Sequence, residues 1–207
     1  MIIAITMRVT KAEGYSEPRD SISHDWLRSL QKWGMMPILV PNIGSRSIEY
    51  ITKIPPDIIL LTGGEDLGKD PVRDETEITL FDYAWGQSIP VFGVCRGLQL
   101  INVRLGGQLG PINGHVANSH PVIIAPKWKN FYTSNPIVNS FHNIGIPSCN
   151  VAPELNIMAN DLSGYVEAVQ HKTRPIAAIM WHPEREGGLP GDVSLMKSLV
   201  SASDVTT

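Results

Sequence analysis

The sequence has few cysteines and no excess of basic residues. Among its 207 residues are only two cysteines, Cys95 and Cys149, which are too few for a disulfide framework and favour a reducing compartment such as the cytoplasm. The formal net charge is -3 and the Lys and Arg residues are scattered, so the pattern does not suggest a nucleic-acid partner. We therefore expect a small-molecule partner and no nucleic acid.

Long apolar segments are also missing. No stretch approaches the roughly 20 apolar residues that cross a bilayer, and the start, MIIAITMRVTKAEG, lacks the charged flank and long apolar segment of a secretion signal. A hydrophobic fraction of 43% in 207 residues is enough to bury a full core. We expect one domain over residues 1–207, cytoplasmic and without a membrane partner. The sequence carries no signal for its oligomeric state.

Apolar runs alternate with helical patterns through the first half of the chain. Strands are expected at residues 2–7, 35–41, 56–64 and 90–94, and helices at 21–33, 48–54, 74–89 and directly after residue 95. From residue 115 the runs become shorter (HPVIIAP, LNIMAND, YVEAVQH and PIAAIMWHPE), and VSLMKSLVSA reads as a closing helix. This order predicts an α/β fold with a central, mostly parallel sheet between helices, flavodoxin-like, with a small antiparallel β extension.

Three short motifs follow strands that should end at the same edge of this sheet: TGGED, GVCRG and WHPE. In GVCRG, Gly93 and Gly97 allow a strand-to-helix turn sharp enough to expose Cys95. The backbone N–H of Arg96 and the start of the next helix can then lower the pKa of the thiol and hold an oxyanion. The alternative is that Cys95 is an inert core residue, since free cysteines are often buried.

The WHPE motif supplies the partners that a cysteine nucleophile needs. His182 and Glu184 are two residues apart at a strand end, so their side chains project to the same side and Glu184 can orient His182 as a base. A structural role is expected for four of the other histidines: His24, His115, His120 and His171. The H-E-x-x-H and paired C-x-x-C patterns are missing, and we expect no metal and no cofactor.

Together these motifs resemble a known enzyme family. In chain order, LLTGGEDL, PVRDETE, PVFGVCRGLQLINVRLGG, VNSFHNIGI and MWHPE are similar to the class I glutamine amidotransferase superfamily over essentially the whole chain. The elbow and WHPE mark the superfamily, whereas RDETE and VNSFHN resemble its γ-glutamyl hydrolase branch, which includes γ-glutamyl-γ-aminobutyrate hydrolases. Within that branch the chain also resembles hydrolases that remove glutamate from a γ-glutamyl nucleotide phosphoramidate (CDP-amidate) in bacterial capsule synthesis.

The resemblance implies a hydrolase with a Cys-His-Glu triad. Cys95, a thiolate beside protonated His182, would attack the γ-glutamyl carbonyl and form a thioester, with Glu184 orienting His182. The backbone N–H groups of Gly64 and Arg96 would hold the oxyanion. The implied substrate-binding residues are Gln99, Asn139, Ser140, Phe141 and His142. Arg19, expected in the loop after the first strand, is either a partner for a substrate carboxylate or a solvated loop charge.

Three positions depart from the pattern of the branch. Relatives commonly have a second His and a Gln after SFH, where this chain has Asn143 and Ile144, and many have Gln where it has Met180. The leaving group therefore stays open between a nucleotide phosphoramidate and γ-aminobutyrate or another amine. Two further alternatives are a glutaminase component of an amidotransferase and a non-catalytic thiol sensor. Cys149 has no visible partner.

Overall fold

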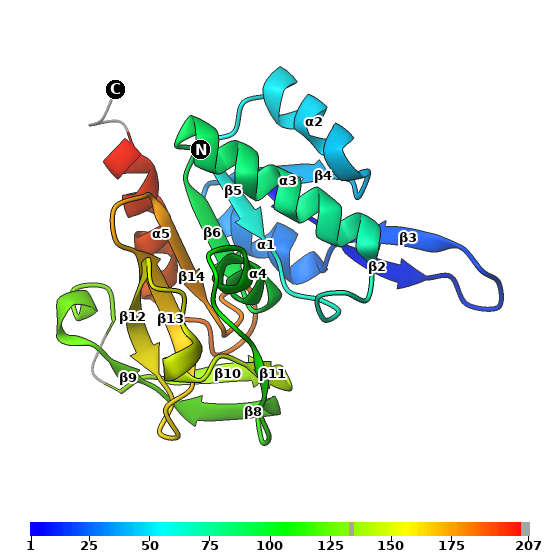
Figure 1. The fold of residues 1–207 in the computed structure, drawn as a ribbon. Coiled ribbons are helices and arrows are strands. Elements are labelled where there is room, and N and C mark those ends of the chain that lie inside the picture. The colour runs from blue at the N-terminus through cyan, green and yellow to red at the C-terminus, as the bar shows by residue number, and fades with distance from the viewer. Residues whose placement is uncertain (133–134, 204–207) are drawn as a thin grey trace.

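The computed structural model describes residues 1–132 and 135–203 and is organised around one eight-stranded sheet (Figure 1). Neighbouring strands follow the order β4 (Met36–Val40), β1 (Ile2–Thr6), β5 (Ile58–Leu61), β6 (Val91–Val94), β14 (Ile176–Ile179), β13 (Val166–His171), β12 (Leu155–Asn160) and β9 (Ile123–Ile124). The first five strands pair in parallel and the last three are added in antiparallel pairs. The predicted mostly parallel sheet with an antiparallel extension is confirmed.

The central strands are apolar because both of their faces are covered. Every residue of β5, β6 and β14 is buried, which is typical of parallel strands between two layers of helices. In Figure 1, α3 lies in front of the sheet and α1 lies behind it. The α-helices are α1 (His24–Lys32), α2 (Ile48–Lys53), α3 (Pro71–Gln87), α4 (Arg96–Arg104) and α5 (Pro190–Ser203), and the 3-10 turns are η1 (Gly44–Ser47), η2 (Pro126–Trp128) and η3 (Ser148–Asn150).

Helix α3 begins earlier than the sequence pattern predicts. Asp70 caps it, with its carboxylate accepting from Arg73 N at 2.9 Å, and Pro71 occupies the first turn, where its missing N–H costs no hydrogen bond. The earlier start brings Pro71, Val72 and Arg73 into the helix. No helix in the described part of the chain is both long and apolar enough to cross a membrane.

Three small antiparallel pairs lie outside the main sheet. They are β2 (Arg8–Lys11) with β3 (Pro18–Ser21), β8 (Val116–Pro121) with β10 (Ile137–Phe141), and β7 (Gly110–Pro111) with β11 (Ile144–Gly145). The loop expected after the first strand is therefore partly a hairpin. Similarly, residues 120–126 only partly extend the main sheet, because β8 pairs with β10 and only β9 reaches the edge of the sheet.

The turn between β6 and α4 packs directly on the end of β5. A Cβ atom on Gly97 would lie 2.3 Å from the backbone oxygen of Leu61, and this oxygen cannot move away without displacing β5. We expect Gly97→Ala to lower the free energy of unfolding by about 1–3 kcal/mol, measured by urea denaturation. Gly86→Ala is the control: a Cβ there meets no atom within 4 Å, and in α3 it should be neutral or slightly stabilising. Equal stability of both variants would contradict the tight turn.

Candidate active site

Cys95 lies at a sharp turn where β6 passes into α4. Its backbone angles are φ 53° and ψ -103°, a conformation rarely adopted by residues with a side chain and one in which strain is stored at functional sites. Its N–H donates to the Ile179 carbonyl of β14 at 2.8 Å, and its own carbonyl accepts from Leu98 N and Gln99 N in the first turn of α4. The expected elbow is present, with Cys95 between the carboxyl end of β6 and the first turn of α4.

His182 and Glu184 form a buried pair after β14. His182 Nδ1 lies 2.8 Å from Glu184 Oε1, a distance at which the ring N–H donates to the carboxylate and leaves Nε2 as the free nitrogen. A Cβ atom on Gly63 would lie 3.5 Å from both Cys95 Cβ and His182 Nε2. The segments after β5, β6 and β14 therefore converge at Gly63, as the sheet-edge argument predicts.

Asn139 and Asp192 hold the segment that carries His182. The Asn139 side chain accepts from His182 N at 2.8 Å and donates to the His182 carbonyl at 2.8 Å, so it clamps the backbone of this residue on both sides. The indole Nε1 of Trp181 donates to both oxygens of Asp192 at 3.1 Å. Asn139 therefore fixes the position of the base, a contact with the backbone that the motif alone does not reveal.

The other residues expected to bind the substrate differ in what they contact. Gln99 Nε2 donates to the Ile144 carbonyl at 2.9 Å, and Ser140 Oγ donates to the carbonyl of His115 at 2.6 Å. The ring of Phe141 packs edge-on against His182, with centroids 5.5 Å apart. Thus Phe141 adjoins the candidate base directly, while Gln99 and Ser140 bind backbone carbonyls in this structure. Their contacts with a substrate stay predictions, as do those of His142.

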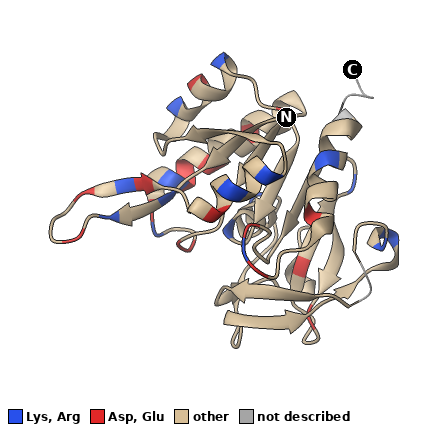
Figure 2. Cartoon of the chain, turned by 180° about the vertical axis from the view of Figure 1, so that it is seen from behind, with Lys and Arg blue, Asp and Glu red and all other residues tan. Residues whose placement is uncertain are grey.

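Arg19 lies in the hairpin rather than in a loop at the sheet edge. It belongs to β3, where its guanidinium contacts Glu17 Oε1 and the hydroxyl of Tyr15, each at 2.5 Å. Figure 2 shows this hairpin projecting from the body, with acidic and basic residues along it. The structure thus engages Arg19 within its own hairpin and does not bring it together with Cys95 or His182. A contact with substrate is an untested prediction.

A buried network of charges supports the loop after β5. Arg73 is fully buried, donates to the carbonyls of Thr62 and Gly63 at 3.1 and 3.0 Å, and pairs with Glu77 at 3.1 Å. Glu77 also contacts Arg96, at the start of α4, through its second oxygen. Because the network holds both the Thr62–Gly63 backbone and Arg96, it fixes the two segments that carry the candidate oxyanion donors.

This network was not predicted from the sequence, where RDETE indicated only a likeness to a family. A signal was available: Arg73 and Glu77 are separated by four residues and lie on one face of α3, a spacing at which opposite charges pair. What the spacing does not show is that both side chains are fully buried.

Burial changes the expected ionisation of Cys95. It raises the pKa of the thiol to about 12, and the charges of Glu184 and Glu167 act in the same direction, whereas the Arg96 N–H lowers the pKa by a smaller amount. Burial thus acts against the lowered pKa and the resting thiolate that the sequence predicts. The cause is that Cys95 is 5% exposed, so desolvation outweighs the helix start. Burial therefore favours the neutral thiol, and a thiol in these surroundings needs a base to react.

Alkylation can test this ionisation state. In a Cys149→Ser variant, in which the exposed second cysteine is removed, we expect the rate of Cys95 alkylation by iodoacetamide to rise with pH and to show no plateau below about pH 9. The reason is that only the thiolate reacts, and its fraction keeps rising until the pH exceeds the pKa. The rate would be followed by intact-protein mass spectrometry. A plateau near pH 6–7 would instead indicate a resting thiolate–imidazolium pair.

The chain is similar to proteins named as hydrolases. The model of the Peptidase C26 family matches residues 1–184. The chain is 29% identical to the gamma-glutamyl-CDP-amidate hydrolase of Campylobacter jejuni, over 97% of this chain and 98% of the relative. It is 26% identical to the gamma-glutamyl-gamma-aminobutyrate hydrolase PuuD of Escherichia coli K12, over 88% and 85%. The crystal structure of a candidate GMP synthase component from Thermoplasma acidophilum aligns with a TM-score of 0.75, at 22% identity over 100% and 96%.

Proposed function

The chain belongs to the Peptidase C26 family of glutamine amidotransferase-like hydrolases acting on γ-glutamyl amides, and from this premise we propose that Cys95 hydrolyses a γ-glutamyl nucleotide phosphoramidate. The convergence of Cys95 and His182 on Gly63, with Glu184 bound to His182, is the observation that carries the proposal. A nucleophile, a base and an orienting carboxylate are the parts that covalent acyl transfer requires.

In the first half of the reaction, the neutral thiol is activated only as it reacts. His182 Nε2 takes the proton of Cys95 while the sulfur attacks the γ-carbonyl carbon, and Glu184 stabilises the imidazolium. The negative oxygen is held by the N–H groups of Gly64 and Arg96, and one such donor is worth about 3 kcal/mol in comparable sites. His182 then gives its proton to the leaving nitrogen, the C–N bond breaks, and a γ-glutamyl thioester remains on Cys95.

In the second half, water replaces the leaving group. His182 Nε2 removes a proton from the water as its oxygen attacks the thioester carbon, and the same N–H groups hold the oxyanion. The C–S bond then breaks, the sulfur regains the proton, and glutamate leaves. The clamp of Asn139 on the His182 backbone keeps the base in one position through both halves.

The choice of leaving group rests on the length of the match. The hydrolase of γ-glutamyl-CDP-amidate aligns with 97% of this chain and 98% of its own length, so the match extends over nearly the whole of both proteins. The γ-aminobutyrate hydrolases align over 88% and 85%. On this basis we propose the nucleotide phosphoramidate, used in capsule synthesis, over γ-glutamyl-γ-aminobutyrate.

A direct test compares three substrates. The purified protein is incubated separately with γ-glutamyl-CDP-amidate, γ-glutamyl-γ-aminobutyrate and glutamine, and released glutamate is measured by mass spectrometry. We expect kcat/KM for the nucleotide phosphoramidate to exceed the others by about tenfold or more. Intact-mass analysis of quenched samples should find the glutamyl group on Cys95.

Each other outcome has a defined meaning. A preference for γ-glutamyl-γ-aminobutyrate would replace the proposed leaving group and leave the hydrolase mechanism intact. Preferred turnover of glutamine would indicate the glutaminase component of an amidotransferase. Release of glutamate from none of the three, with no acyl group on Cys95, would contradict the proposed function and favour a thiol sensor.

A further inference from the structure

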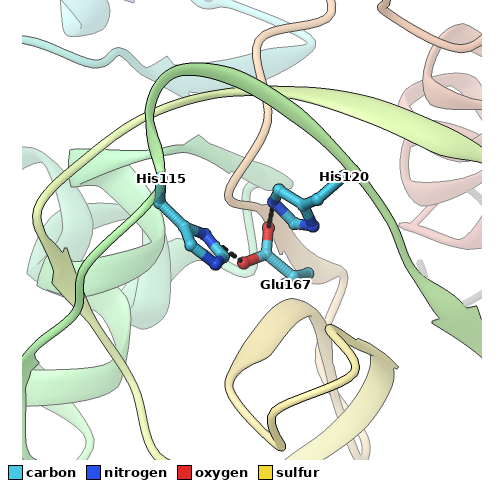
Figure 3. A group of neighbouring side chains, drawn as sticks. All are labelled: His115, His120 and Glu167. Carbon is cyan, nitrogen blue, oxygen red and sulfur yellow. Dashed lines mark ion pairs between the residues drawn. The ribbon is translucent and has the colours of Figure 1, made fainter.

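Three histidines and a glutamate converge at the antiparallel end of the sheet. His115 precedes β8, His120 lies in β8, His142 follows β10, and Glu167 lies in β13. Figure 3 shows His115 and His120 directed at Glu167 from the segment that passes over it. His115 Nδ1 lies 3.5 Å from Glu167 Oε1, and His120 Nε2 lies 3.9 Å from Glu167 Oε2. His142 Nε2 is 3.7 Å from Glu167 Oε1.

The outer contacts of two histidines fix which ring nitrogen carries the proton. His115 Nε2 faces Asp161 Oδ2 at 3.3 Å, and His142 Nδ1 faces the Ile144 carbonyl at 3.0 Å. A carboxylate and a carbonyl only accept, so each of these ring nitrogens donates. The inner nitrogens, His115 Nδ1 and His142 Nε2, therefore carry lone pairs, and they face each other at 3.3 Å.

Glu167 adds two more acceptors to the same space. Its side chain is fully buried, and neither carboxylate oxygen accepts a hydrogen bond from the described residues. A buried carboxylate without donors is costly unless a cation or a proton compensates it. Four acceptor atoms, from His115, His142 and Glu167, therefore face one another with no donor between them. The Nε2 atom of His120, which lies near the same carboxylate, also has no hydrogen-bond partner among the described residues.

We propose that His115, His120 and Glu167 bind a divalent transition-metal ion of the zinc type, with His142 as a further ligand. The ligand atoms of the first three lie within 4.8 Å of one another. Tetrahedral zinc with bonds of about 2.0–2.1 Å separates its ligands by roughly 3.3 Å, which small movements of the side chains would reach. Imidazole and carboxylate ligands suit zinc, and the contacts of His115 with Asp161 and of His142 with Ile144 resemble the outer partners of metal-bound histidines.

The sequence predicts no metal here because the ligands form no compact motif. His115 and His120 are five residues apart, but Glu167 arrives from β13, and His142 from the strand that pairs with β8. Only the packing of these segments against each other brings the four side chains together. The proposal adds a ligand role to the structural role that the sequence predicts for His115 and His120.

Metal binding is tested in protein that carries Cys95→Ala, so that the thiol of the candidate triad cannot take the ion. After treatment with a chelator, the protein is titrated with Zn²⁺ by calorimetry and with Co²⁺ by visible absorption. We expect one equivalent of each ion to bind, a tetrahedral Co²⁺ spectrum without a sulfur-to-metal charge-transfer band, and a higher Tm with Zn²⁺.

Variants assign the binding to these residues. Glu167→Gln and His120→Gln, each added to Cys95→Ala, should weaken Zn²⁺ binding at least about tenfold, whereas the exposed His24→Gln should leave it unchanged. His120 is the less buried ligand, so its variant guards against misfolding of the Glu167 variant. Absence of stoichiometric binding, or binding equally tight in both variants, would overturn the proposal and leave a proton on Glu167 as the compensation. Because Cys95→Ala has no nucleophile, this result is independent of the proposed hydrolysis.

Discussion

Cys95→Ala should abolish glutamate release while leaving the protein folded. The variant removes the sulfur that forms the thioester, and neither His182 nor the oxyanion donors can replace a covalent nucleophile. We expect kcat to fall by at least about 10⁴-fold, as for removal of the nucleophile in other triads. The measurement is release of glutamate from γ-glutamyl-CDP-amidate, with the unfolding midpoint in urea as a check of folding. The loss of one small buried atom should lower stability only modestly.

Cys149→Ala is the matched control for this variant. Cys149 is exposed in η3, and its removal should leave both kcat and stability unchanged. Substantial hydrolysis by Cys95→Ala would contradict a cysteine mechanism and require another nucleophile. Equal loss of activity in both cysteine variants would point to a general effect of thiol removal.

The central sheet was predictable because its signal is local. The runs that became β5 and β6 are short, apolar and followed by glycines, so each can be recognised without its partners. The hairpin of β2 and β3 was missed since its residues are polar and it is stabilised by pairing between its own two strands. Likewise, the run at residues 120–126 was expected to extend the sheet, but its first two residues belong to β8, whose pairing with β10 is decided by contacts distant in sequence.

In the candidate site, too, some features could be predicted from the sequence and others could not. The meeting of Cys95 with His182 follows from the rule that parallel strands end at one edge, and it was predicted. The raised pKa of Cys95 was not, because burial depends on the whole packed site. Nor could the motif show that Asn139 binds the backbone of His182, or that His142 turns toward Glu167. Residue types can indicate a site, whereas proton positions depend on neighbours supplied by the fold.

The network beneath the site shows why RDETE accompanies the elbow. Glu77 lies between two buried guanidinium groups, those of Arg73 and Arg96. Arg73 also binds the carbonyls before Gly64, and burial beside Arg73 lowers the pKa of Arg96 to about 10, so that Arg96 still carries its charge at neutral pH. Without an acid between them, two like charges would be buried side by side. Glu77 therefore both compensates the charges and connects the two backbone segments proposed to hold the oxyanion.

Glu77→Ala should be among the most damaging single changes in the chain. Removing Glu77 takes away the fully buried counter-charge that Arg73 and Arg96 share, and breaking a buried pair typically costs about 3–5 kcal/mol, measured here by urea denaturation. Under conditions where the variant is folded, we also expect a lower kcat, since Arg73 would no longer be held in place under the Thr62 and Gly63 carbonyls.

Asp82→Ala is the matched control, because Asp82 pairs with Arg104 across the same two helices at the surface. That exposed pair is worth about 0–1 kcal/mol, so the control should differ little from the unmodified protein. A loss for Glu77→Ala as small as for Asp82→Ala would show that Glu65 and Asp74, which also contact the two arginines, suffice to hold them.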